Sequence, residues 1–336
     1  MAKATTSIRT GGLVGAVALI TALGTSTAAS GEGPGPGRAS YPSSFVAAVS
    51  GGRGSSGLAV FSTVDGHLTK WLHHSTRGPL PIAISPDGRW VYYYNSLTLP
   101  LGGCPKTGFA EPTLWRVRAS GGRPQRTGLR TTNIAFSPDG RMAAHASVRH
   151  CGRIMLAVVK DRRTGAVRTI VLDHNAPTAS APDFFPLLSW APDDKHLAVG
   201  LSRTPVLSFV YVVNARRATS ILNLPPIRPC AERNTVCLDP AFDIRGRLTL
   251  LRFKNQAGSR ESVVRWRHRH LTRLVALTRD QSDYDTASIA TDRAGSAVLI
   301  QGGLHAVKIW RWSGVQPVLI VSSSAARTTF SPLWLR

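Results

Sequence analysis

The sequence predicts an all-β protein: a six-bladed β-propeller of four-stranded blades, with the ring closed by a C-terminal strand that joins the N-terminal blade. Three observations support this prediction. A Ser-Pro-Asp-Gly turn between apolar runs recurs with a period near fifty residues. Each period holds four strand-like runs joined by Gly-containing turns. The two ends of the chain contain complementary parts of one further unit.

The repeated turn sets the register of the blades. Asp87 and Asp139 lie 52 residues apart in two strict copies of the turn, and a third copy, Ala191–Asp194, loses the glycine. Later copies, DIRG from Asp243 and DRAG from Asp292, keep an Asp and a Gly at a different spacing. The residues to which we assign the structural turn are Pro86, Asp87, Gly88, Pro138, Asp139, Gly140, Pro192 and Asp193.

Each residue type in this turn has a conformational role. Proline sets φ near −65°, as the second position of a type I turn requires. The aspartate carboxylate accepts backbone N–H groups of the turn, and glycine tolerates a positive φ where the next strand begins. The alternative is a ring of carboxylates that bind cations, but each aspartate would then have to leave its own turn.

The ends of the chain predict how the ring closes. SFVAAVS at 44–50 resembles a second strand that has no first strand before it. RTTFSPLWLR at 327–336 resembles a first strand that has nothing after it. Pairing the two completes the sixth blade and hides sheet edges that would otherwise template aggregation.

The N-terminus has the pattern of a secretory signal peptide over residues 1–29. Lys3 and Arg9 precede the uncharged apolar run 13–23, and small residues at 27–29 offer a cleavage site near Ala29. The alternative is an uncleaved membrane anchor, but the run is shorter than the roughly 20 residues that span a bilayer. We therefore expect a secreted, extracytoplasmic protein with a disordered linker over 30–42 and a propeller over 43–336.

The chain is strongly basic, with 41 Lys and Arg against 18 Asp and Glu and a net charge of +23. Such a surplus attracts polyanions such as nucleic acid or acidic cell-wall polymer, although a basic surface also serves solubility. The densest basic stretch is RWRHRHLTR at 265–273. Its pattern also fits an outer hairpin with alternating faces. The candidate polyanion ligands in it are Arg265, Arg267, Arg269 and Arg273.

The SPDG turns and the apolar strands that follow them resemble the TolB-like branch of the WD40-like propeller repeats. The resemblance covers residues 42–336 as architecture and says little about activity, because function lies in sites placed on a fold. It implies that the SPDG turns lie on one face and that binding uses the opposite face. That face would carry the long loops 100–112, 173–185, 225–238 and 278–286.

The four cysteines are Cys104, Cys151, Cys230 and Cys237. An even number in an exported chain indicates disulfides, and three pairings are open. The resemblance places Cys104 and Cys151 in loops between the second and third strands of neighbouring blades. It places the other two in one loop that enters the fifth blade. It therefore implies the pairs Cys104–Cys151 and Cys230–Cys237.

No catalytic or cofactor-binding motif is evident. The sequence lacks a G-x-S-x-G elbow and a strand-associated dinucleotide loop. Asp280, Asp283 and Asp285 are spaced loosely as calcium ligands, without the other ligands of an EF-hand, and a solvated loop explains them better. We expect a monomeric binding module without cofactor, which takes a protein partner, an envelope ligand or an anionic polymer. The rival is a secreted enzyme of the lactonase or cyclase kind that uses dispersed channel residues.

Overall fold

The structure is a computed structural model, and the residues that it describes belong to the unit Ala39–Arg336. They are residues 42–51, 56–95, 111–149, 154–174, 186–204, 207–232, 235–254, 260–267, 270–278, 288–302, 308–314, 316–322 and 327–335.

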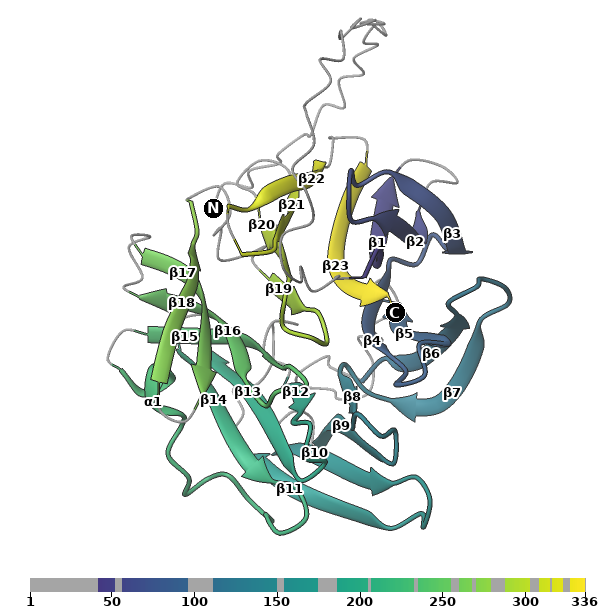
Figure 1. Ribbon diagram of the computed structural model, residues 1–336. Coiled ribbons are helices and arrows are strands. Elements are labelled where there is room, and N and C mark those ends of the chain that lie inside the picture. Colours follow the sequence, from purple (N-terminus) through teal and green to yellow (C-terminus); the bar gives the residue numbers. More distant parts are fainter. Residues whose placement is uncertain are drawn as a thin grey trace, which may run out of the picture. The chain divides into compact units, whose positions relative to one another are not determined.

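Six antiparallel sheets form the blades of a propeller, as predicted (Figure 1). The innermost strands of blades 1 to 6 are β23 (Arg327–Leu335), β4 (Pro79–Ile84), β8 (Ile134–Phe136), β12 (Leu187–Trp190), β15 (Thr235–Phe242) and β19 (Ser288–Thr291). The second strands are β1 (Ser44–Gly51), β5 (Trp90–Asn95), β9 (Met142–Arg149), β13 (His196–Thr204), β16 (Leu248–Lys254) and β20 (Val298–Gly302).

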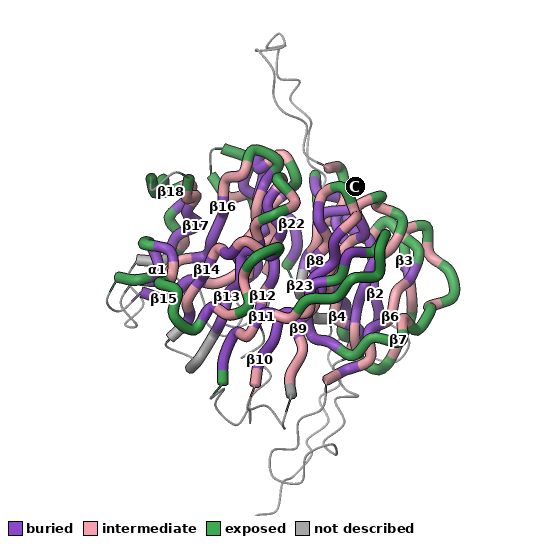
Figure 2. Tube along the Cα trace, turned by 90° about the horizontal axis from the view of Figure 1, so that it is seen from below, coloured by how far each residue is buried: buried purple, intermediate pink, exposed green. Residues whose placement is uncertain are grey.

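The outer half of each blade is a hairpin or a single strand. The third strands are β2 (Gly57–Ser62), β6 (Thr113–Arg118), β10 (Ile154–Asp161), β14 (Leu207–Asn214), β17 (Arg260–Arg267) and β21 (Lys308–Trp312). The fourth strands are β3 (Leu68–His74), β7 (Gln125–Arg130), β11 (Val167–Asp173), β18 (His270–Ala276) and β22 (Val318–Ser322). Figure 2 shows the buried stretches along the inner strands and exposed stretches along outer strands such as β7 and β18.

Blade 4 differs from the others, because its described sheet has three strands. The segment after β14 leaves its own blade and forms a bridge from Ser220 to Val171 on β11 of blade 3. Ile221 is 2% exposed in the core between these two blades, which gives the detour an apolar anchor. The chain then turns into the short helix α1 (Arg228–Ala231), which contacts β14 and β15.

The ring closes at blade 1 as the termini predict. In Figure 1, β23, at the C-terminal end of the chain, lies beside the N-terminal strand β1. The two pair antiparallel from Ser44 opposite Leu335 to Gly51 opposite Arg327. Trp334 extends the closure to blade 6, because its indole N–H donates to the Ala290 carbonyl at 2.8 Å.

Apolar side chains fill the spaces between blades. Each of the hydrophobic clusters joins residues of two adjacent blades, as in the cluster of Phe45 and Ala59 from blade 1 with Leu299 and Ile309 from blade 6. The other clusters repeat this arrangement around the ring. Neighbouring blades therefore depend on each other for the burial of their strands, which is why a propeller needs a complete ring.

The alternation of antiparallel strands defines two faces. Connections between first and second strands, and between third and fourth strands, lie at one end of the ring, which we call the turn face. Connections between second and third strands, and those that enter the next blade, lie at the opposite end, which we call the loop face.

The SPDG turns carry the hydrogen bonds that join their own strands. In blade 2, the Asp87 carboxylate accepts the Ser85 hydroxyl at 2.5 Å and the Arg89 N–H at 3.1 Å. The Ser85 oxygen in turn accepts the Trp90 N–H at 2.9 Å. Ser137 and Asp139 repeat this pattern in blade 3. These carboxylates are therefore occupied by their own turns, as turn aspartates commonly are.

In blades 5 and 6 a single aspartate replaces the Ser–Asp pair of the SPDG turn. Asp243 and Asp292 stand at the position of Ser85 and accept the main-chain N–H groups that follow. Both are almost fully buried, with 2% and 1% of the residue exposed. The aspartates of these two turns thus lie two positions earlier than the SPDG aspartate, which explains their different spacing from the turn glycine in the sequence.

The third turn has an aspartate where the others have glycine. Asp194 has a φ of 53°, close to the 72° of Gly140, and a side chain is strained in this region. Burial and the nearby Asp139 carboxylate also raise the pKa of Asp194. We expect Asp194→Gly to stabilise the protein by about 0.5–1 kcal/mol, measured as a higher urea midpoint.

The reverse change serves as the control for this prediction. Gly140→Ala places a Cβ at a φ of 72° and 3.3 Å from the Pro86 ring, so we expect a loss of about 1–2 kcal/mol. An Asp194→Gly protein that unfolds at the same urea concentration as the wild type, or lower, contradicts the assignment of strain to Asp194.

Candidate functional site

The inner strands surround a channel along the axis of the propeller. A cavity of about 340 Å³ occupies its loop-face half and one of about 310 Å³ its turn-face half. Several side chains border both cavities, among them Ile82 from blade 2, Leu188 from blade 4 and Ile289 from blade 6. The loop-face cavity is lined by apolar residues and by the polar side chains of Tyr94, Thr132, Asn133, Asp239 and Ser288. A concave space with convergent polar groups is a usual form of a ligand site.

Asp239 is the notable polar residue of the loop-face half. It lies on β15 next to Pro240, where the pairing with β16 shifts register between Leu238 and Ala241. Proline donates no hydrogen bond to a ladder, so the strand bulges at this point. The bulge holds Asp239 at a φ of 50°, a conformation uncommon for residues other than glycine.

The bulge directs the Asp239 carboxylate toward blade 6, where it accepts the Ile289 N–H at 2.8 Å. Burial raises the pKa of Asp239 to about 6, because the charged carboxylate loses solvent in the channel wall. The group can therefore change between hydrogen-bond donor and acceptor near pH 6. A half-buried carboxyl with a raised pKa in a cavity wall is a candidate functional group.

Polar side chains also link the inner strands of other blades. The Asn133 side-chain oxygen accepts the Leu188 N–H at 3.2 Å, and the Ser189 hydroxyl oxygen accepts the Phe242 N–H at 2.9 Å. Asp239 thus belongs to a series of bonds that hold adjacent blades together. The hydrogen bond between Asp239 and Ile289 is explained by this structural role. Because its pKa is raised, the same carboxyl is also a titratable group in the channel wall.

Asp239 gives a measurable pH dependence. A carboxyl whose pKa is raised in the folded state contributes stability below its unfolded value near 4, and this stability is lost as the pH rises through 6. Asp239→Asn keeps an acceptor for the Ile289 N–H and removes the charge. We expect a melting temperature about 2 °C or more above the wild type at pH 7.5 and little difference at pH 4. The same difference at both values contradicts a channel-facing titration of Asp239.

The predicted site residues fall in different places. Asp280, Asp283, Asp285, Arg269, Cys104 and Cys151 lie outside the described residues. So do most residues of the loops 100–112, 173–185 and 278–286. Within the described part of the chain, no group of three or more His, Cys, Asp or Glu side chains is arranged to hold a metal.

The basic stretch 265–273 forms the expected outer hairpin of β17 and β18. Arg267 and Arg273 are exposed. Arg265 is half-buried, and its guanidinium donates to the Gly295 carbonyl of blade 6 at 2.5 Å. Burial is the main cause that lowers the pKa of Arg265. Arg265 therefore joins two blades, and Arg267 and Arg273 are the more accessible cations of the hairpin.

The Cys230–Cys237 disulfide is present as predicted. Cys230 lies on α1 and Cys237 on β15, so the second cysteine belongs to a strand where the sequence indicated a loop. Both are buried in the core between blades 4 and 5. Arg252 on β16 also holds the helix, through the Pro229 carbonyl at 3.3 Å and the Glu232 carboxylate at 2.5 Å.

Comparison with known proteins supports the architecture. No family model and no curated protein matches the chain. Among solved structures, it is similar to TolB from Acinetobacter baumannii, with a TM-score of 0.61, 15% sequence identity and coverage of 89% of this chain and 68% of that one. Hydrazine synthase from Kuenenia stuttgartiensis matches at a TM-score of 0.46, with 17% identity over 75% of this chain and 70% of that one.

Fold and channel together define the class of protein: a six-bladed β-propeller with a TolB-like fold. At 15% identity the similarity concerns the fold alone. Within the described residues, no helix has the length and apolar character needed to cross a membrane.

Proposed function

We propose that the chain is an exported binding module that holds a ligand or a protein partner at the loop-face end of its channel. The observation that carries this proposal is the cavity of about 340 Å³ at that end, with mixed apolar and polar walls and Asp239 as an acidic anchor. The strand order brings connections of all six blades to this end of the ring, so a partner can be recognised by several blades at once. This is the face opposite the SPDG turns, whose carboxylates are occupied by their own strands.

Export is supported by the N-terminal sequence pattern and by the disulfide, because disulfides persist in oxidising compartments. We propose that the mature protein begins after Ala29 and is a monomer. N-terminal sequencing of the secreted protein and its mass in solution test these two points. A mature protein that retains Lys3 and Arg9 contradicts cleavage.

The rival function is catalysis by dispersed channel residues. Asp239, with its raised pKa, favours this reading because a group that titrates near pH 6 can transfer protons. The other titratable side chain in this half of the channel, among the described residues, is Tyr94. A nucleophile activated by a neighbouring base is not part of this lining, so binding explains the cavity with fewer assumptions.

A channel-filling variant tests the proposal. Ala241 borders both halves of the channel, so Ala241→Trp fills the space where a ligand enters. Ala276 is exposed on outer strand β18, so Ala276→Trp is the matched control. Tagged mature proteins are incubated with extracts of the envelope and culture medium of the exporting cell, and the bound molecules are quantified by mass spectrometry.

The expected result is a molecule that the wild type and Ala276→Trp retain equally and that Ala241→Trp loses at least tenfold, with all three melting within a few degrees of each other. Equal retention by all three proteins places binding away from the channel and contradicts the proposal. A molecule that is chemically converted by the wild type but not by Asp239→Asn identifies an enzyme.

A further inference from the structure

Three adjacent grooves follow the outer part of the turn face across blades 2, 3 and 4. The first, of about 510 Å³, is lined by residues around Trp90 in blade 2. The second, of about 420 Å³, shares Trp90 and reaches the SPDG turn of blade 3. The third, of about 280 Å³, lies between blades 3 and 4. We call their cationic lining the arginine belt: Arg89, Arg116, Arg118, Arg162, Arg168 and Arg216.

Trp90 arranges the first part of the belt. The Arg116 guanidinium lies 4.2 Å from the centre of the indole ring, and that of Arg118 lies 5.5 Å from it. The Arg116 Nε also donates to the Gln125 side chain at 3.1 Å. Stacking on an aromatic ring limits the rotation of a guanidinium but leaves its N–H edge available to an oxyanion. Two guanidinium groups are thus held on one indole at the start of the groove.

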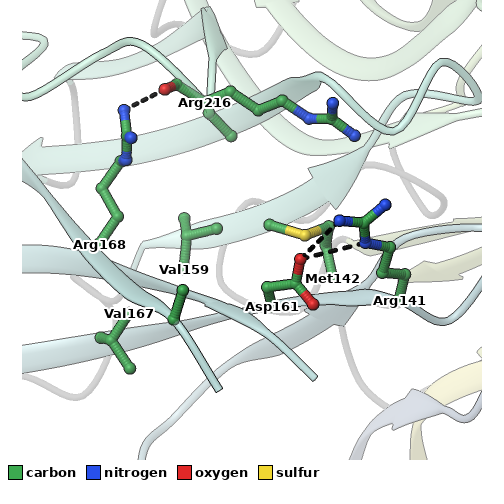
Figure 3. Close-up of a pocket in the computed structure, with 9 residues that line it drawn as sticks. Arg141, Met142, Val159, Asp161, Val167, Arg168 and Arg216 are labelled. Atoms are coloured by element: carbon green, nitrogen blue, oxygen red, sulfur yellow. Dashed lines mark hydrogen bonds and ion pairs between the residues drawn. The ribbon is translucent and has the colours of Figure 1, made fainter. Parts of the chain in front are cut away.

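Arg162 continues the belt at the second groove. Its guanidinium lies 5.6 Å from the centre of the Phe136 ring and donates to the Gly140 carbonyl at 2.9 Å. In the third groove, Arg168 reaches the Arg216 carbonyl, and Asp161 pairs with Arg141 at 2.9 Å (Figure 3). Met142, Val159 and Val167 form an aliphatic floor beneath these charges.

The aspartates that line these grooves do not neutralise the positive charge of all the arginines there. The three linings contain seven arginines, including Arg141, and three aspartates, a surplus of four positive charges. Asp87 and Asp139 accept hydrogen bonds within their own turns, Asp87 forms an exposed ion pair with Arg89 at 3.9 Å, and Asp161 is paired with Arg141. An anion that enters the grooves therefore meets guanidinium groups whose charge is in excess.

The aromatic residues distinguish between classes of polyanion. Nucleic acid binding without sequence preference uses open aromatic faces on which bases stack. Here Trp90 is covered by arginines, the Phe136 ring has Tyr92 at 5.0 Å and Arg162 at 5.6 Å, and Tyr92 is buried. The remaining floor is aliphatic. A chain of phosphates joined by short polyols fits such a surface better than a chain that carries bases.

We propose that the arginine belt binds a linear polymer of phosphodiester-linked polyols, of the kind found in anionic cell-wall material. Guanidinium groups match phosphate oxygens in geometry and charge, and the three adjacent grooves offer several guanidinium groups to one linear polymer. The site is independent of the channel and uses the opposite face of the propeller. The protein could therefore bind the polymer through its turn face while its loop face remains free to bind a ligand.

The probe for this proposal is a fluorescently labelled synthetic poly(glycerol phosphate) of about ten units, with binding followed by fluorescence anisotropy at several salt concentrations. Arg89, Arg118 and Arg216 are exposed belt residues, so the triple variant Arg89→Gln, Arg118→Gln, Arg216→Gln removes three charges at the surface. The control removes three other exposed charges, outside both the belt and the 265–273 hairpin, with Arg77→Gln, Arg228→Gln and Arg245→Gln. Both variants have the same net charge.

We expect the belt variant to raise the Kd at least tenfold at low salt and to reduce the slope of log Kd against log salt by about two to three. The control should change the Kd less than threefold. Equal losses in the two variants show attraction to net charge alone and overturn the proposal. Tighter binding of an oligothymidylate of the same number of phosphates, lost in the belt variant, assigns the belt to nucleic acid and also overturns it. Unchanged melting temperatures establish that both variants are folded.

Discussion

Deletion of residues 327–336 should abolish the cooperative unfolding of the propeller. These residues form β23, the inner strand of blade 1, and their loss exposes the edge of β1 along its whole paired length. It also removes Trp334 and Leu335 from the cores that join blade 1 to blades 6 and 2. The ring would then have no closing contact. We expect an aggregated product or a broad thermal transition in place of a single sharp one.

Two further proteins make this result interpretable. Removal of the ten residues 30–39, which the sequence predicts to be linker, should leave the melting temperature unchanged. Trp334→Ala keeps the strand but removes the indole and its bond to Ala290, so we expect a graded loss of about 3–5 kcal/mol. A truncated protein that melts sharply within a few degrees of the wild type would show that blades 1 to 6 are stable without closure.

Asp243→Ala should be among the most destabilising single substitutions. The Asp243 side chain is fully buried and accepts the Arg247 Nε at 2.6 Å, together with the main-chain N–H groups of Arg245 and Arg247. Without it, the largely buried Arg247 has no carboxylate partner and lies close to Arg265. Removal of one partner of a buried ion pair costs about 3–5 kcal/mol. Chemical denaturation of the purified variant measures this loss.

The corresponding turn of blade 2 provides the control. Ser85→Ala removes an uncharged hydroxyl and its hydrogen bonds at the equivalent position, for which we expect a loss of about 1 kcal/mol. The double variant Asp243→Ala, Arg247→Met removes both charges. It should be more stable than Asp243→Ala alone, because the largely buried Arg247 guanidinium is no longer left without its carboxylate partner. A double variant that is less stable would show that the loss comes from the turn hydrogen bonds and not from the buried guanidinium.

Much of the fold was predictable because its signals are local. Proline, aspartate and glycine in the SPDG turns each constrain the backbone within four residues, and alternating apolar runs on both sides indicate strands. The Cys230–Cys237 pair was expected from the resemblance to TolB-like propellers, which places both cysteines in one loop that enters the fifth blade. The three-stranded sheet of blade 4 was not predictable. The segment around Ile221 leaves its own blade because it packs into the apolar core shared with the preceding blade.

The candidate sites were much less predictable. Asp239 had a signal in the sequence, an Asp-Pro pair inside a strand-like run, but its pKa depends on burial against blade 6. Arg265 carried a misleading signal, because the basic stretch does not reveal that its guanidinium is tied to the Gly295 carbonyl of the next blade. The bonds from Arg265 to Gly295 and from Leu188 to Asn133 join residues that are 30 and 55 positions apart.

The sequence by itself determined the architecture of this protein: a repeat of about fifty residues, turns that set the strand register, and termini that complete one blade. The tertiary structure decided where its chemistry lies. Ile82, Leu188 and Ile289 meet in the channel, and Arg116, Arg168 and Arg216 fall on one face, only because the ring brings separate blades together. Turn conformation is governed by adjacent residues, whereas burial, desolvation and charge density depend on contacts between residues remote in the chain.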